Sequence, residues 1–153
     1  MPRILTKCFA EIEYSDTCLY CFPEGLPGYE REKAFVFLNR PDSHPLMFMQ
    51  SAQTPDLCFV LLPIFVVDRA YRLSLDDEDL ERLRLPVTHQ PRIGEDILCA
   101  AILCSRGNGD PPTANLLAPV VVNIRDRIGI QAIQTQSGYS HRHPLPAPAE
   151  PCL

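Results

Sequence analysis

Proline is the residue that most restricts the fold of this chain. The 153-residue sequence contains 16 prolines, and they occur along its whole length. Each proline removes a backbone hydrogen-bond donor and interrupts the interior of a helix, which disfavours long helices and favours short strands joined by turns. The length suits one domain with a single core, so no second domain is needed.

Runs of apolar, β-branched and aromatic residues, bounded by Pro, Gly, Asn or Ser, predict the strands. These runs are 18–22, 34–38, 46–50, 57–62, 96–104, 119–124 and 130–135. The run at 96–104 is almost continuously apolar, as expected of a central strand that is covered on both faces. The charged connection at 125–129 contains Gly129 and can close an antiparallel hairpin between the last two strands.

The helical signals are short. Asp76 can cap a helix over 77–83, and the acidic first turn of that helix complements its macrodipole. A second helix of a single turn is predicted to begin at Thr113, and it must end before Pro119. We therefore expect a mainly β single domain with one or two short helices.

Charge and targeting signals limit the class of protein. The net charge of −5 and the pI near 5.3 argue against direct binding of nucleic acid, which relies on a basic surface. The first residues lack the apolar core of a signal peptide, and no apolar run approaches the length of a membrane span. Seven cysteines, an odd number without a compact framework, fit free thiols in a reducing compartment. These features predict a cytoplasmic protein that does not associate with membranes.

Cysteine and histidine offer the main candidates for site chemistry. Cys18 and Cys21 have the spacing of half a zinc site or of a redox pair. If 18–22 is a strand, however, the two thiols point to opposite faces, about 10 Å apart along the chain. His141 and His143 are expected in an exposed loop. We therefore expect no catalytic residues, no metal and no cofactor, although a metal or thiol-redox protein remains the alternative from another class.

The segment 113–124 carries polar residues where a core strand would be apolar. Asn115 and Asn123 interrupt it, and Pro119 removes a backbone donor where the strand begins. Side-chain alternation puts Asn123 on the face opposite Val120, so that Asn123 need not be buried. The two asparagines either satisfy turn and edge backbone groups or belong to a contact surface, and the segment alone does not decide between these roles.

Several motifs together resemble those of the bacterial flagellar assembly factor family, the FliW type, in the family's order across nearly the whole chain. They are the turn segment 22–30, Gln50-Ser51 ahead of 55–57, the helix start at 77–80, the segment 113–123, and Tyr139-Ser140 ahead of 142–145.

The resemblance implies a small, mainly antiparallel β-barrel-like domain, which we expect over 1–143. The Pro-rich segment 144–153 lacks donors for strand pairing and apolar mass for packing, so it is expected to be a flexible tail. The resemblance also implies a non-enzymatic protein, expected to be a monomer when free. Members of the family bind flagellin in the cytoplasm and also bind the RNA-binding translational repressor CsrA. Flagellin level is thereby coupled to translation of flagellin mRNA. A flagellin chaperone without this regulatory activity is the nearest alternative.

Two groups of residues are the candidates for partner binding. The first group, which we name the amide surface, consists of Asn115, Leu117 and Asn123. The second group, which we name the acidic surface, consists of Glu24, Asp77, Glu78 and Asp79.

Overall fold

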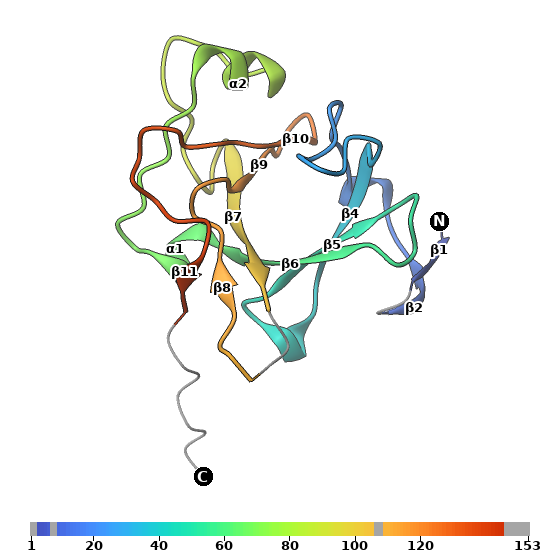
Figure 1. Cartoon of the computed structure of the whole chain (residues 1–153). Coiled ribbons are helices and arrows are strands. Elements are labelled where there is room, and N and C mark those ends of the chain that lie inside the picture. The colour runs from blue at the N-terminus through green and yellow to red at the C-terminus, as the bar shows by residue number, and fades with distance from the viewer. Residues whose placement is uncertain (1–2, 7–8, 106–108, 146–153) are drawn as a thin grey trace.

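A closed ring of strands is the centre of the molecule. The computed structural model describes residues 3–6, 9–105 and 109–145, and the ring is visible in Figure 1. Its strands are β3 (Leu19–Cys21), β4 (Ala34–Asn39), β5 (Met47–Ser51), β6 (Cys58–Pro63), β7 (Ile97–Cys104), β9 (Val120–Asn123) and β10 (Ile128–Gln131). They are ordered β7-β6-β5-β4-β3-β10-β9, and β9 pairs again with β7. The expected β-barrel is therefore confirmed.

The ring is antiparallel at every junction but one. β3 and β10 run parallel, and Cys21 pairs with Ile128 where they meet. The remaining neighbours, from β3–β4 round to β9–β10, pair antiparallel. The barrel is therefore mainly antiparallel, as predicted, with one parallel seam.

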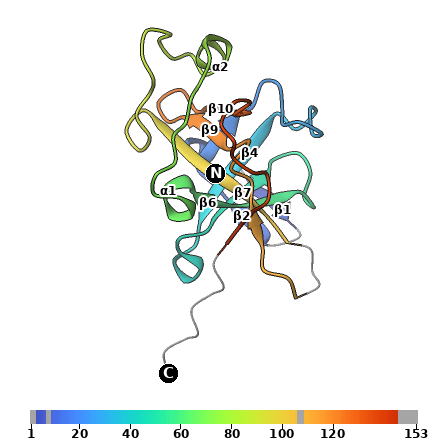
Figure 2. The same cartoon turned by 60° about the vertical axis from the view of Figure 1, so that its left-hand side comes forward.

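Short elements extend or cover the ring. β8 (Thr113–Ala114) and β11 (His143–Pro144) continue the sheet from β7, while β1 (Arg3–Thr6) and β2 (Ala10–Glu13) form a separate hairpin. The helical elements are α1 (Ile64–Val67), α2 (Asp77–Arg82) and the 3-10 turns η1 (Asp16–Cys18) and η2 (Pro41–Ser43). Figures 1 and 2 place α2 far from the N-terminal hairpin.

Buried apolar residues form two clusters on the two faces of the ring strands. The barrel interior contains Phe22, Leu26, Phe35, Met47, Met49, Leu61, Ala100, Val120 and Val122. The second cluster, which we name the outer layer, includes Ile64, Tyr71, Leu75, Leu80, Leu83, Ile97, Cys99, Ala101, Leu116, Val121 and Ile130. Alternate residues of β7 enter the two clusters, which confirms this strand as one covered on both faces.

The predicted hairpin forms between β9 and β10, but β10 covers Ile128–Gln131 rather than 130–135, and Gly129 has a different role. Gly129 lies within β10, and the connection ends at Arg127, which takes up the left-handed φ of +53°. A Cβ on Gly129 would lie 2.4 Å from Cζ of Phe22 and 2.7 Å from Cγ1 of Val122. Gly129 is therefore required because the Phe22 ring occupies the space beside it in the barrel interior.

The prediction of a helix at 77–83 is confirmed, and that of a helix from Thr113 is wrong. α2 is capped by Asp76, whose Oδ1 accepts the Asp79 N–H at 2.8 Å. Thr113 instead pairs with Cys104 on one side and Pro144 on the other. Thr113 therefore lies between one strand on each side, β7 and β11. Pairing with two strands outweighs the weak preference for a single helical turn.

The C-terminal end of the fold reaches slightly beyond the predicted domain boundary. Pro144 belongs to β11, and Leu145 packs against the outer layer. The remainder of the expected tail, 146–153, lies outside the described residues.

Candidate partner-binding site

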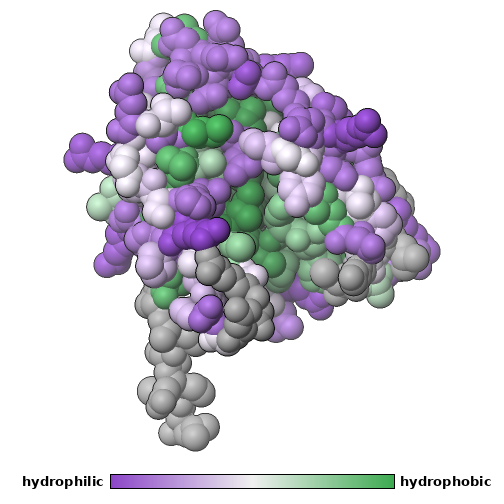
Figure 3. All heavy atoms as spheres, viewed as in Figure 1, coloured by the Kyte–Doolittle hydropathy of each residue, from purple (hydrophilic) through white to green (hydrophobic). Residues whose placement is uncertain are grey.

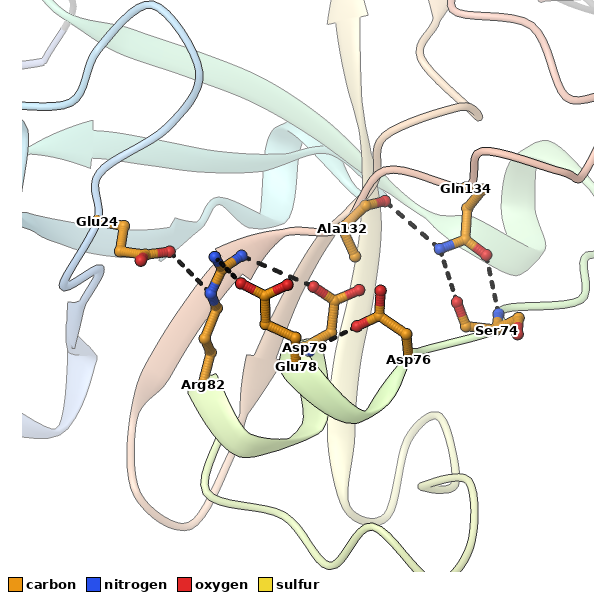
Figure 4. A network of polar contacts seen from close by, with 8 residues as sticks. All are labelled: Glu24, Ser74, Asp76, Glu78, Asp79, Arg82, Ala132 and Gln134. Atoms are coloured by element: carbon orange, nitrogen blue, oxygen red, sulfur yellow. Dashed lines mark hydrogen bonds and ion pairs between the residues drawn. The ribbon is translucent and has the colours of Figure 1, made fainter.

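The acidic surface is assembled around Arg82, from parts of the chain distant in sequence. The Arg82 guanidinium lies 3.0 Å from Glu24 in the β3–β4 connection, 2.6 Å from Glu78 and 4.0 Å from Asp79 (Figure 4). Three carboxylates against one guanidinium leave this group negative. The structure therefore brings Glu24 to α2, and Arg82 is the residue of this site that the sequence analysis missed.

The acids of this surface differ in exposure. The side chains of Glu24 and Glu78 are 62% and 69% exposed, whereas that of Asp79 is 14% exposed. Burial raises the pKa of Asp79, and the neighbouring carboxylate of Asp76 raises it further by a smaller amount. The positive charge of Arg82 opposes this shift. Asp77 lies exposed in the first turn of α2. Figure 3 shows a mostly hydrophilic surface over the region that α2 occupies in Figure 1.

Two glutamines hold the chain just before α2, and the sequence analysis also missed them. Gln134 accepts the Ser74 N–H at 2.8 Å and donates to the Ser74 carbonyl at 3.0 Å. Gln90 makes the same pair of hydrogen bonds with Leu75, both at 2.9 Å. We name Gln90 and Gln134 the glutamine clamp. Gln134 sits close to Ser74 in Figure 4.

Asn123 is buried, contrary to the expectation that it need not be. It is 2% exposed, its Nδ2 donates to the Leu83 carbonyl at 2.8 Å, and its Oδ1 accepts from the backbone N–H groups of Arg125 and Asp126. The face of β9 that carries Asn123 is covered by the outer layer, which alternation alone could not reveal. Asn123 therefore joins the hairpin turn to the end of α2 rather than lying on a surface.

The structure does not bring the amide surface together. Asn115 is half-buried, and its backbone N–H donates to the carbonyl of Ile102, while Asn123 pairs with Ile97. These two positions on β7 are roughly 16 Å apart at the usual rise of a strand. Asn115 accepts the Ala118 N–H at 3.0 Å, in the same turn as the half-buried Leu117. Only Asn115 and Leu117 remain neighbours.

In the part of the chain that the structure describes, the cysteines form neither a disulfide nor a metal site. Cys18 ends η1 and Cys21 ends β3. Burial raises the pKa of the Cys99 thiol to about 12, which keeps it protonated and unreactive at neutral pH. No group of three or more His, Cys, Asp or Glu side chains among the described residues is arranged to hold a metal ion.

The helices are short throughout the ranges 3–6, 9–105 and 109–145. None of them combines the length and apolarity that crossing a membrane would require.

Comparison with known proteins gives concordant results. The family model described as "FliW protein" matches residues 3–145. The flagellar assembly factor FliW of Geobacillus kaustophilus is 38% identical over 144 residues, covering 94% of each chain. That of Syntrophomonas wolfei is 31% identical over 148 residues, covering 97% of this chain and 91% of the relative.

The fold gives the same result as the sequence. A crystal structure of the flagellar assembly factor FliW superimposes with a TM-score of 0.81 at 35% identity, covering 97% of this chain and all of the other. A closed barrel with short helices, matched by sequence and by structure over nearly its whole length, shows that this chain belongs to the FliW family of flagellar assembly factors.

Proposed function

We propose that this protein binds flagellin and a CsrA-type translational repressor in the cytoplasm, and thereby couples the level of flagellin to translation of its mRNA. Membership of the FliW family is the observation that carries the proposal. The protein acts in this scheme by binding alone and without catalysis.

The acidic surface supports the repressor part of the proposal. A protein that binds RNA presents a basic surface to the phosphates, and the carboxylates of Glu24, Asp77 and Glu78 complement such a surface. An acidic protein docked beside an RNA site also disfavours the approach of phosphates through its field. Repressor binding at the acidic surface would therefore weaken RNA binding without covering the RNA site.

Mass action then makes the protein a sensor of flagellin. If flagellin and the repressor exclude each other on this chain, each lowers the apparent affinity of the other. Abundant flagellin occupies the protein and leaves the repressor on its mRNA. Scarce flagellin releases the protein, which then removes the repressor and restores translation.

Direct binding measurements test both partners. Purified chain is titrated with flagellin and, separately, with a CsrA-type repressor by calorimetry. We expect a complex with each partner. Absence of binding to both at micromolar concentration would overturn the proposal.

A charge reversal tests the acidic surface. In the double variant Glu24→Lys, Glu78→Lys, both glutamates that pair with Arg82 become basic, and we expect affinity for the repressor to fall by on the order of tenfold, with a flatter salt dependence. The matched control is Glu11→Lys, Glu13→Lys, in which the two glutamates that pair with Arg3 on the N-terminal hairpin change in the same way. Equal losses in the two double variants would show a net-charge effect and refute the assignment.

Release of RNA separates regulation from chaperoning. The repressor is loaded with flagellin mRNA, and RNA release is followed with and without this protein. Release supports the full proposal. If flagellin binds and the RNA stays bound, the protein is a flagellin chaperone without regulatory activity.

A further inference from the structure

The position of α2 requires an explanation, because the helix is too short to be stable without contacts to the rest of the protein. It has six residues, and isolated helices of that length are not stable in water. Its ion pair with Glu24 is mostly exposed, and exposed ion pairs contribute little. The contacts that fix α2 must therefore lie at its two ends and beneath it.

The glutamine clamp fixes the chain before the helix. Each glutamine gives one backbone residue both a donor and an acceptor, which are the two hydrogen bonds that a neighbouring strand would supply. Ser74 and Leu75 are consecutive, and Asp76, the N-cap of α2, follows directly. The start of the helix is thus held at two successive residues by side chains from different parts of the chain.

The same clamp is tied to the barrel. Gln134 is 4% exposed, and its backbone N–H donates to the carbonyl of Leu117 at 2.7 Å. At the other end of the helix, Asn123 holds the carbonyl of Leu83, the C-cap residue. Beneath the helix, Leu80 packs in the outer layer. These contacts orient α2 so that Arg82 lies next to Glu24 of the β3–β4 connection.

We propose that Gln90 and Gln134 are positioning residues for partner binding: they hold α2 in the orientation that assembles the acidic surface. This inference rests on the proposed binding of the repressor at that surface. Neither glutamine needs to touch the partner, because each acts through the backbone that leads into α2.

Two variants and one matched control test the inference. Gln90 is exposed, so Gln90→Ala removes its hydrogen bonds without opening a cavity. Gln134→Met removes the second pair in the buried half of the clamp. The control is Gln50→Met, because Gln50 is also fully buried. Its Nε2 donates to the carbonyl of Ser51, the last residue of β5, at 3.1 Å, and to the carbonyls of Thr54 and Pro55 in the loop that follows.

The measurements are amide hydrogen exchange of residues 77–83 and affinity for the repressor, both well below the unfolding temperature of each variant. We expect both clamp variants to speed exchange in α2 by tenfold or more and to weaken repressor binding several-fold. Gln50→Met removes a buried amide that bonds to Ser51, Thr54 and Pro55 and not to the segment before α2, so exchange in α2 and repressor affinity should stay at native values. If the repressor affinity of all three variants, Gln50→Met included, falls in proportion to their loss of global stability, the inference is overturned.

The remaining outcomes separate this inference from the proposed function. If the native chain does not bind the repressor, the proposed function fails and the inference falls with it. If the native chain binds and the clamp variants bind equally well despite faster exchange in α2, only the inference is overturned.

Discussion

The barrel interior and the outer layer are held together in different ways. The barrel interior holds a cluster of apolar and aromatic side chains, such as those of Phe22 and Phe35. The outer layer is also apolar, but buried amides at its margin, those of Asn123 and Gln134, bond to the backbone of the segment that covers the ring. Apolar packing therefore sets the shape of the ring, and side-chain amides set where the covering segment lies on it.

This difference has a physical reason. Strands of a closed ring satisfy their backbone groups in each other, so the barrel interior needs only volume and shape. Among the described residues, no strand pairs with the α2 segment at Ser74 and Leu75, so side chains supply the hydrogen-bond partners of its backbone groups. We therefore expect substitutions in the barrel interior to affect the whole molecule and substitutions of the amides to act mainly on α2.

Truncation within the barrel interior should have the largest effect. Phe35 is fully buried, and its ring packs 5.2 Å from that of Phe22. Phe35→Ala should lower the free energy of unfolding by about 3–5 kcal/mol, measured by urea denaturation. The exposed aromatic Tyr29 is the control, and Tyr29→Ala should cost far less. Similar losses at both positions would contradict the assignment of Phe35 to the core of the barrel.

Adding one methyl group to the barrel interior should have the second largest effect on stability. Gly129→Ala places a Cβ against the ring of Phe22, and such overpacking costs about 1–3 kcal/mol. Phe22→Leu in the same chain should recover part of this loss, because it vacates the space that the new methyl group needs. Strict additivity of the two substitutions in a double-mutant cycle would show that the contact with Phe22 is not the cause.

Removal of an amide side chain at the outer layer should have a smaller effect, confined to part of the molecule. Asn123→Ala leaves the Leu83 carbonyl and two turn N–H groups without their partner, at a cost of about 1–3 kcal/mol. The loss should appear as faster hydrogen exchange in α2 and in the 124–127 turn before the barrel opens. Asn115→Ala removes one turn hydrogen bond and should leave α2 unaffected. Unchanged exchange in α2 after Asn123→Ala would break the comparison.

The smallest expected effect is the pH dependence from Asp79. Burial raises the pKa of this carboxyl in the folded state, so the folded protein binds its proton more readily than the unfolded chain. Asp79 therefore lowers stability at neutral pH, and this penalty disappears as pH falls through the folded pKa to below about 3.9, the value in an unfolded chain.

Asp79→Asn should accordingly be more stable than the native chain at neutral pH, with an advantage that vanishes in acid. Urea midpoints measured across the pH range test this. Asp77→Asn makes the same charge change at an exposed position of the same helix, and the difference between the two variants isolates the burial of Asp79. A less stable Asp79→Asn at neutral pH would show that attraction to Arg82 outweighs burial.

Local sequence signals predicted the local parts of the fold. The cap at Asp76 predicted α2, and the apolar run at 96–104 predicted β7 with both faces covered. The parallel seam between Cys21 and Ile128 could not be read from either strand, because strand pairing over such a separation leaves no local pattern. At Thr113 the cap signal was outweighed by strand pairing on both sides.

The site was predictable only in part, for a related reason. The acids of α2 stand together in the sequence, but their meeting with Glu24 depends on the fold and on Arg82. Gln90 and Gln134 carry no local signal at all, since an amide that bonds to a distant backbone looks like any other glutamine. Asn123 was recognised as unusual, while its burial depended on a covering segment from elsewhere in the chain.

The parallel seam also determines the order in which the molecule can be completed during its synthesis. β3 is among the first strands to leave the ribosome, and its partner β10 is the last strand of the ring to emerge. Until then β3 has one unpaired edge, and β7 lacks its partner β9 until residues 120–123 have been made. Such long-range closure is slow and leaves strand edges open to wrong partners. The ring therefore closes only after β10, its last strand in chain order, has been translated.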